Sequence, residues 1–128
     1  MELRDVQYIR HMLDYCVEIQ DAKARFGNSF QAFLNDRDYQ KSISFSILQI
    51  GELSNRLSME YRGATMRDIP WKSIIGMRNV VVHDYGHIEY DILWDTISNG
   101  IPALQKFCEE QLDRPEAKEL LAKLDNLS

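Results

Sequence analysis

The sequence lacks the short motifs that mark the most common nucleotide-binding and hydrolytic enzymes. Its 6 glycines lie too far apart to form either of the glycine-rich phosphate loops, GxxxxGK and GxGxxG. HExxH, CxxC and the GxSxG nucleophile elbow are also missing. These absences exclude the motif-defined NTPases, the simple zinc enzymes and the α/β-hydrolases.

Cysteine and proline are scarce. The 2 cysteines, Cys16 and Cys108, have no metal-ligand pattern around them, so we expect two reduced thiols packed inside the protein. Only 3 prolines occur and the hydrophobic fraction is 45%, which excludes disorder as the main character of the chain. The length of 128 residues predicts a single domain, residues 1–128, that can fold without disulfides or metals.

Long apolar runs are absent. No stretch approaches the roughly 18 residues needed to cross a bilayer. The N-terminus mixes charges of both signs where a signal peptide would have an apolar centre. We therefore expect a cytoplasmic protein with no membrane partner.

Positive charge is in the minority but is concentrated in one part of the chain. The formal net charge is −5, which argues against a broad nucleic-acid-binding surface. Between Arg56 and Arg78, however, five basic and two acidic residues give a local balance of +3, which leaves −8 for the rest. This distribution predicts a small electropositive site on an acidic body.

Apolar residues recur at helical spacing in the first half of the chain. A first helix is predicted over residues 3–26, with Gly27 as its C-cap, and Ser29 caps a short helical turn after it. A second long helix begins at Asp36 or Asp38. The apolar stripe of the first helix contains Leu3, Val6, Ile9, Leu13, Cys16, Val17 and Ala24, and that of the second contains Tyr39, Ile43, Ile47, Ile50, Leu53 and Leu57.

The middle of the chain predicts a third helix. Gly63 ends the preceding part, or a short turn after it, and the new helix begins at Pro70, whose φ is preset for a first helical position. We expect this helix to end near Gly86. The valines at 80–82 could form a strand by themselves, but no second strand is available to pair with them, so a helix is favoured.

The last part of the chain completes the predicted architecture. A fourth helix begins at Asp91, and a kink is expected at Pro102 because proline removes the hydrogen bond to the carbonyl of Ser98. A last short helix begins at Pro115. Four principal helices with short connections predict an all-α, up-down helical bundle with additional short helices.

One segment gathers the side chains that could carry chemistry. Arg78, His83 and Tyr85 place a permanent positive charge, an imidazole and a phenol within about two helical turns. His87 follows His83 by four residues, so the two could also bind a metal, although Gly86 separates them and no third ligand is evident. In a purely structural interpretation, Arg78 pairs with a carboxylate on a neighbouring helix, and His83 and Tyr85 pack at a helix end.

Helix geometry limits how these three side chains can meet. Positions seven apart differ by about 20° around a helix axis, so Arg78 and Tyr85 share a face, whereas His83 is turned about 140° away from Arg78. The three converge only if the helix ends near His83 or a second chain supplies the missing partner. A two-fold dimer would bring two Arg78 and two His83 side chains to one groove.

The segment has the form R-x4-H-x-Y, with Arg78, His83 and Tyr85 at the three fixed positions. This is the signature of the HepT-like family of HEPN domains, the RNase toxins of toxin–antitoxin pairs, which the chain resembles. The sequence DIPWKSIIGMRN at 68–79 and LQIGEL at 48–53 resemble two further blocks of that family. The resemblance covers essentially the whole chain in length and in helix order.

The resemblance implies a helical homodimer that cleaves RNA without a metal or another cofactor, at a groove on the dimer interface. Arg78 would neutralise charge on the phosphorane, since its guanidinium fork matches phosphate oxygens. His83 would exchange protons with the reacting oxygens, since histidine offers both protonation states at neutral pH. Asn79 would orient the substrate or His83.

Tyr85 has two interpretations. It could pack at the helix end, where its hydroxyl finds a partner. The resemblance implies instead that Tyr85 accepts AMP from an MntA-like minimal nucleotidyltransferase, the antitoxin partner. An AMP group beside Arg78 and His83 would occupy the place of the RNA, and the toxin would be silenced.

Alternatives from other functional classes stay open at this point. The chain could be a catalytically silent HEPN-type dimer that serves as a binding partner for a nucleotidyltransferase, or a metal-dependent hydrolase that uses His83 and His87. Trp71 and Trp94 could stack on bases, but their apolar surroundings favour packing in the core. Glu52 is expected to pair with Arg78 or a neighbouring arginine.

Overall fold

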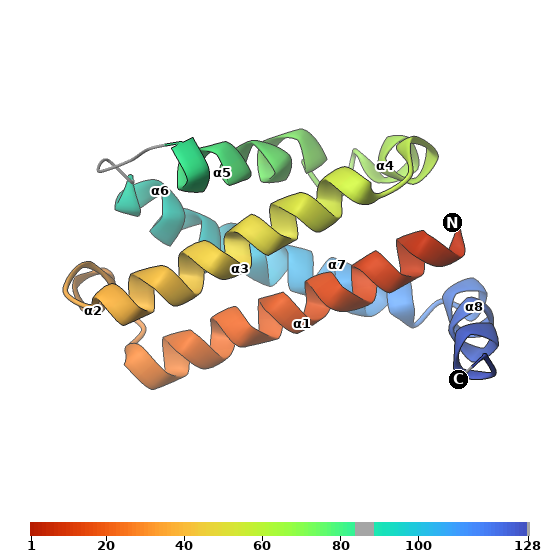
Figure 1. Cartoon of the computed structure of the whole chain (residues 1–128), viewed down its shortest axis with the longest axis horizontal. Helices are drawn as coiled ribbons and strands as arrows, with labels where there is room; N and C mark the ends of the chain where they lie inside the picture. Colours follow the sequence, from red (N-terminus) through yellow and green to blue (C-terminus); the bar gives the residue numbers. More distant parts are fainter. Residues whose placement is uncertain (84–88, 128) are drawn as a thin grey trace.

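The computed structural model describes residues 1–83 and 89–127, and every regular element in that part of the chain is a helix (Figure 1). The elements in chain order are α1 (Leu3–Phe26), α2 (Phe30–Leu34), α3 (Arg37–Arg56), α4 (Met59–Thr65), α5 (Trp71–His83), α6 (Tyr90–Asp95), the π-helix η1 (Thr96–Gly100), α7 (Ile101–Leu112) and α8 (Pro115–Asp125). The predicted all-α fold class is confirmed.

Four rods make up the body of the molecule (Figure 1). α1 and α3 run in opposite directions side by side, α5 lies along the outer edge of α3, and the continuous rod of α6, η1 and α7 lies behind them. Each rod reverses the direction of the one before it, so the predicted up-down order of four principal helices is also confirmed. No helix among the described residues combines the length and apolar character required to span a bilayer.

The predicted buried stripe is confirmed in full for α3 and in part for α1, where Val6, Ile9 and Cys16 are buried. All six apolar residues predicted for the second helix are buried. In α1, however, Val17 is 41% exposed and Ala24 lies on the surface, whereas Met12, Ile19 and Ala22 are buried. α1 packs against α3 and α7 through one continuous face, and Val17 is turned about 100° from Cys16 on that face.

The predicted caps of the first three helices are confirmed. Gly27 ends α1 with a φ of 117°, a left-handed backbone conformation that favours glycine. The Ser29 hydroxyl accepts a hydrogen bond of 3.1 Å from the backbone N–H of Ala32. The Asp36 carboxylate accepts bonds of 2.9 and 3.2 Å from the first N–H groups of α3.

Helix α4 was not predicted, and Gly63, expected to end this part of the chain, lies inside it. Ser58 caps α4 by accepting a hydrogen bond of 3.1 Å from the Tyr61 N–H. The buried carboxylate of Asp5, in the first turn of α1, accepts bonds from the Ser58 N–H at 2.7 Å and from the Ser58 hydroxyl at 2.8 Å. The start of α4 is thus determined by a residue more than fifty positions away in the sequence, which local periodicity does not register.

Pro70 lies directly before the helix that it was predicted to begin. α5 begins at Trp71 rather than at Pro70, whose carbonyl instead accepts the first helical bond, 3.1 Å from the Ile74 nitrogen. The helix continues through positions 80–82, so the helical interpretation of the valine run is confirmed. Its predicted end near Gly86 lies outside the described residues.

The predicted disturbance at Pro102 takes the form of the π-helix η1 instead of a break. The Ile101 N–H bonds to the carbonyl of Thr96, five residues earlier, and this wider turn accommodates the proline in the first turn of α7. Cys16 and Cys108 are free and buried, as expected. Burial raises the pKa of the Cys16 thiol to about 12 and also raises that of Cys108, so both thiols stay protonated at neutral pH.

Candidate functional site

The start of α5 is anchored in the core. Ile69 and Trp71 are buried, and the Trp71 indole N–H donates a hydrogen bond of 2.9 Å to the Thr65 hydroxyl. The ring of Trp71 also packs edge-on against Phe107 on α7, with 5.7 Å between ring centroids. Trp94 packs on Phe33 at 5.6 Å. Both tryptophans therefore serve the core, as predicted, and Trp71 fixes the position from which α5 extends.

Glycine at position 51 allows α5 to approach α3 closely. A Cβ atom added to Gly51 would lie 3.1 Å from the Cβ of Arg78 and 3.4 Å from the carbonyl oxygen of Ile74. The two sequence blocks at 48–53 and 68–79 are thus neighbours in space. Their contact determines where Arg78 lies relative to α3.

Arg78 and Glu52 form an ion pair across this contact. An Arg78 guanidinium N–H (Nη1) donates to Glu52 Oε1 at 3.0 Å, and the two side chains are 29% and 38% exposed. The predicted pairing is confirmed. A guanidinium carries five N–H donors, so Arg78 can hold Glu52 and still present donors to a phosphate at the surface.

The structure describes only some of the other residues of the predicted site. Asn79 is exposed on α5, next to Arg78. Position 83 follows one helical turn later and is the last residue of α5 that the structure describes. Tyr85 and His87 lie outside the described residues, so the predicted modification site and the His83–His87 metal alternative have no structural account here.

The described residues contain no group of three histidine, cysteine or acidic side chains that could hold a metal ion. The predicted catalytic pair, Arg78 and His83, shares one helix, and geometry turns the two positions about 140° apart. Within one chain the structure brings Arg78 together with Glu52, and Asn79 is the next residue along α5. Convergence with His83 would require a change of direction at the end of α5 or a second copy of the chain.

The other side of α5 packs loosely. A cavity of about 330 Å³ lies between α5 and the rod of η1 and α7, with Ile74, Met77, Thr96 and Leu104 in its walls. The Thr96 hydroxyl donates a weak hydrogen bond to the Met77 sulfur, at 3.9 Å, between η1 and α5. α5 is therefore supported chiefly by α3.

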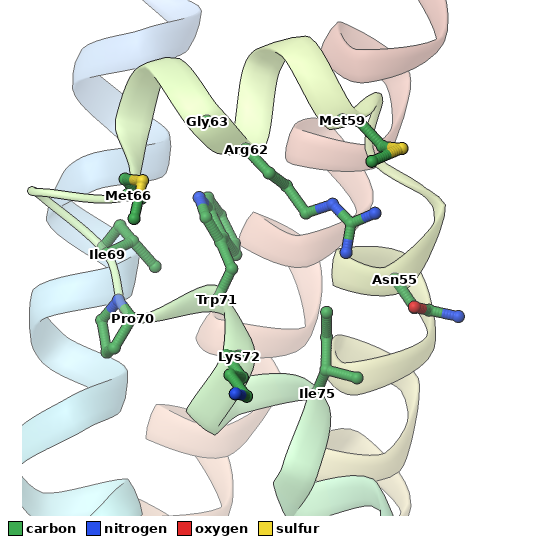
Figure 2. Close-up of a pocket in the computed structure, with 10 residues that line it drawn as sticks. All are labelled: Asn55, Met59, Arg62, Gly63, Met66, Ile69, Pro70, Trp71, Lys72 and Ile75. Carbon is green, nitrogen blue, oxygen red and sulfur yellow. The ribbon is translucent and has the colours of Figure 1, made fainter.

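A second surface feature lies at the start of α5, and its residues were not predicted individually from the sequence. Arg62 on α4 and Lys72 on α5 line one cavity of about 510 Å³ at the start of α5 (Figure 2). The signal for it was the local excess of positive charge between Arg56 and Arg78, which did not indicate which basic residues lie together.

Comparison with known proteins adds to this geometry. The family model described as ribonuclease HepT-like matches residues 12–111. A protein of Caldanaerobacter subterraneus subsp. tengcongensis, named as a candidate RNase, is 35% identical over 107 residues, 84% of this chain and 93% of the relative. A candidate RNase of Methanocaldococcus jannaschii is 24% identical over 120 residues, 93% of this chain and 97% of the relative. No solved structure gives a significant match.

The helical bundle and these matches together define the protein as a ribonuclease by class. The chain belongs to the HepT-like ribonuclease family, to which the family model assigns most of its length. A relative from Thermococcus cleftensis, named as a candidate ribonuclease HepT, is 29% identical over 76 residues, 59% of this chain and 68% of the relative. The resemblance stated from the R-x4-H-x-Y segment and the predicted enzyme class are confirmed.

Proposed function

We propose that the chain is a metal-independent endoribonuclease in which Arg78 and His83 carry the reaction. The observation that carries this proposal is the placement of Arg78. Glu52 holds its guanidinium at 3.0 Å on the half-exposed edge of the α3–α5 pair. A permanent charge is thereby presented to solvent beside Asn79, on the helix that also bears His83.

The chemistry follows from what RNA and these residues offer. In the proposed reaction the 2′-OH oxygen attacks the adjacent phosphorus, the bond from phosphorus to the 5′ oxygen breaks, and a 2′,3′-cyclic phosphate and a 5′-OH end form. A histidine accepts the proton of the 2′-OH, and the 5′ oxygen receives a proton as it leaves. Arg78 stabilises the extra negative charge on the phosphorane. Asn79 donates a hydrogen bond that orients the substrate or His83.

A homodimer is part of the proposal, because a single helix turns Arg78 and His83 apart. Support comes from an exposed apolar ring close to the site. Phe45 is 54% exposed and precedes Glu52 by seven residues, so both positions lie on one face of α3. A second copy seated on this face would cover Phe45 and bring its own α5 toward Arg78.

We further propose that the protein is the toxin of a toxin–antitoxin pair, and that an MntA-like nucleotidyltransferase silences it. In that step the Tyr85 hydroxyl attacks the α-phosphorus of ATP, AMP becomes bound to the tyrosine oxygen, and pyrophosphate leaves. The support is family membership together with a tyrosine at the fixed position of R-x4-H-x-Y. The AMP phosphate would compete with RNA for Arg78.

The catalytic assignment is tested by cleavage of total RNA with EDTA present throughout. Wild type should cleave, and His83→Ala and Arg78→Ala should each lose about 10²–10⁴-fold in rate. His11→Ala is the matched control, since His11 is an exposed histidine on α1, and it should keep full activity. Full activity of His83→Ala would refute the assignment. No cleavage by a wild-type dimer would favour the silent binding partner instead.

The modification is tested by incubation with ATP and an MntA-type nucleotidyltransferase, followed by intact mass spectrometry. Wild type should gain the mass of AMP, and Tyr85→Phe should not. Tyr90→Phe, which removes a hydroxyl five residues away, should gain it like wild type. Persistence of the added mass in Tyr85→Phe would reject the site.

A further inference from the structure

The cavity at the start of α5 lies apart from the motif and combines charge with apolar walls. It has a volume of about 510 Å³, which is within the usual range for a small-molecule site. Figure 2 shows Arg62 extending from α4 across the opening toward Asn55 and Ile75, with Met59 and Met66 on opposite sides of the upper rim.

The charged side chains that line this cavity are all positive. Arg62 and Lys72 line it, and no carboxylate is among its lining residues. Neither cation forms an ion pair with another described residue. The Arg62 Nε is buried and has no hydrogen-bond partner among the described residues, which is a costly state for a guanidinium nitrogen. These features indicate an anionic ligand.

Most of the other lining residues are apolar, and two of them, both methionines, are strongly exposed. Met59 is 82% exposed and Met66 is 67% exposed. The other apolar lining residues are Ile69, Pro70, Trp71 and Ile75. Methionine adapts its shape and contacts aromatic rings favourably. A nucleotide has this same combination of a flat, weakly polar base and an anionic phosphate.

Helix geometry aligns the cavity with positions 79 and 83 of α5, whereas Arg78 is turned about 120° from Lys72 around the helix axis. Lys72 precedes Asn79 by seven residues, so the two positions lie about 20° apart around the axis of α5 and about 10 Å apart along it. Position 83 is again about 20° from Lys72, roughly 17 Å along the same axis. A strand that lay along this face of α5 would pass from the cavity to Asn79 and position 83.

We propose that this cavity binds one nucleotide of single-stranded RNA, a few nucleotides from the cleaved bond, with Arg62 and Lys72 on its phosphates and the methionines against its base. The inference rests on the proposed function for the identity of the ligand. It also accounts for a ribonuclease with a net charge of −5, because the positive charge is placed where the strand lies.

The test measures binding of a fluorescein-labelled, single-stranded 2′-O-methyl RNA dodecamer by anisotropy, since this probe has no free 2′-OH and is not cleaved. Arg62→Gln/Lys72→Gln should weaken binding about tenfold, and Lys72→Gln alone should weaken it in the same direction. Each lost phosphate contact should also reduce the slope of log K against log salt by about 0.7. Thermal unfolding of each variant confirms that it is folded.

The matched control is Arg37→Gln/Lys41→Gln, which removes the same charge from exposed residues at the opposite end of α3. It should bind like wild type. Equal weakening by the two double variants would overturn the subsite and indicate general electrostatics. Unchanged binding by Arg62→Gln/Lys72→Gln, or no binding by wild type, would also overturn it.

Cleavage of an unmodified oligonucleotide separates this inference from the proposed function. Arg62→Gln/Lys72→Gln should raise KM about tenfold and leave kcat within about twofold, since neither side chain touches the reacting atoms. Cleavage with unchanged KM in the variant would remove the subsite and keep the ribonuclease. Cavity-dependent binding by a wild type that never cleaves would keep the subsite and remove the proposed activity.

Discussion

Substitution of Gly51 by alanine tests whether the close approach of α3 and α5 determines the position of Arg78. The added Cβ would lie 3.1 Å from the Arg78 Cβ, so one of the helices must shift by a few tenths of an ångström. Such overpacking costs about 1–3 kcal/mol. Replacing a helical glycine by alanine recovers about 0.5–1 kcal/mol. The expected net loss for Gly51→Ala is about 1 kcal/mol.

Gly76→Ala is the matched control, because Gly76 lies inside α5 and has open space where its Cβ would be added. It should therefore gain about 0.5–1 kcal/mol from helix propensity alone. For a chain of this size 1 kcal/mol corresponds to a shift of about 3–5 °C in Tm, so the two variants should move in opposite directions. Urea and thermal unfolding at one fixed protein concentration measure the difference.

The same pair of variants reports on the site. Because the shift falls at Arg78, Gly51→Ala should reduce RNA cleavage more than its loss of stability explains, while Gly76→Ala should leave cleavage intact. If Gly51→Ala is as stable as Gly76→Ala and fully active, the close contact does not position the arginine and the reasoning is refuted.

Three further predictions concern single residues. Asp5→Ala removes the buried acceptor of two Ser58 hydrogen bonds and should cost about 2–4 kcal/mol in urea unfolding; a loss below 0.5 kcal/mol would contradict the described network. Glu52→Gln keeps an acceptor for Arg78 and should change the free energy of unfolding by less than about 1 kcal/mol. It should nevertheless lower kcat, because the Arg78 guanidinium is held less firmly, and an unchanged kcat would refute the positioning role of Glu52. Burial raises the pKa of Cys16 to about 12, so folding favours the protonated thiol. The contribution of this thiol to stability should therefore be constant below about pH 9 and fall above it. A smaller fall in Cys16→Ala would confirm that Cys16 causes the pH dependence.

Local patterns predicted the elements well where one short segment determines the structure. Gly27, Ser29 and Asp36 act on backbone groups within a few residues, and all three caps were predicted from their neighbours. All six apolar residues predicted for the core face of α3 are buried, although this helix packs against both α1 and α5. In α1, Val17 was assigned to the core on spacing alone, whereas contact with both α3 and α7 selects a different line of residues.

Local sequence patterns did not predict the features that depend on contacts between distant residues. Helix α4 begins where Asp5 reaches Ser58 across the fold, and neither the periodicity nor the turn residues indicated it. The sequence suggested Glu52 as a partner of Arg78 or of a neighbouring arginine, and the contact between α3 and α5 decides that the partner is Arg78. Arg62 and Lys72 line the same cavity because the chain turns between α4 and α5, and sequence spacing does not predict the direction of that turn.

α5 packs chiefly against α3, and this arrangement affects how the sequence of the protein can evolve. The core formed by α1, α3 and α7 packs without help from the outer face of α5, and a cavity of about 330 Å³ lies on the other side of that helix. Substitutions on the outer face therefore carry little risk to folding. If α5 carries the site, as proposed, substrate preference can change along this one helix while the scaffold stays constant.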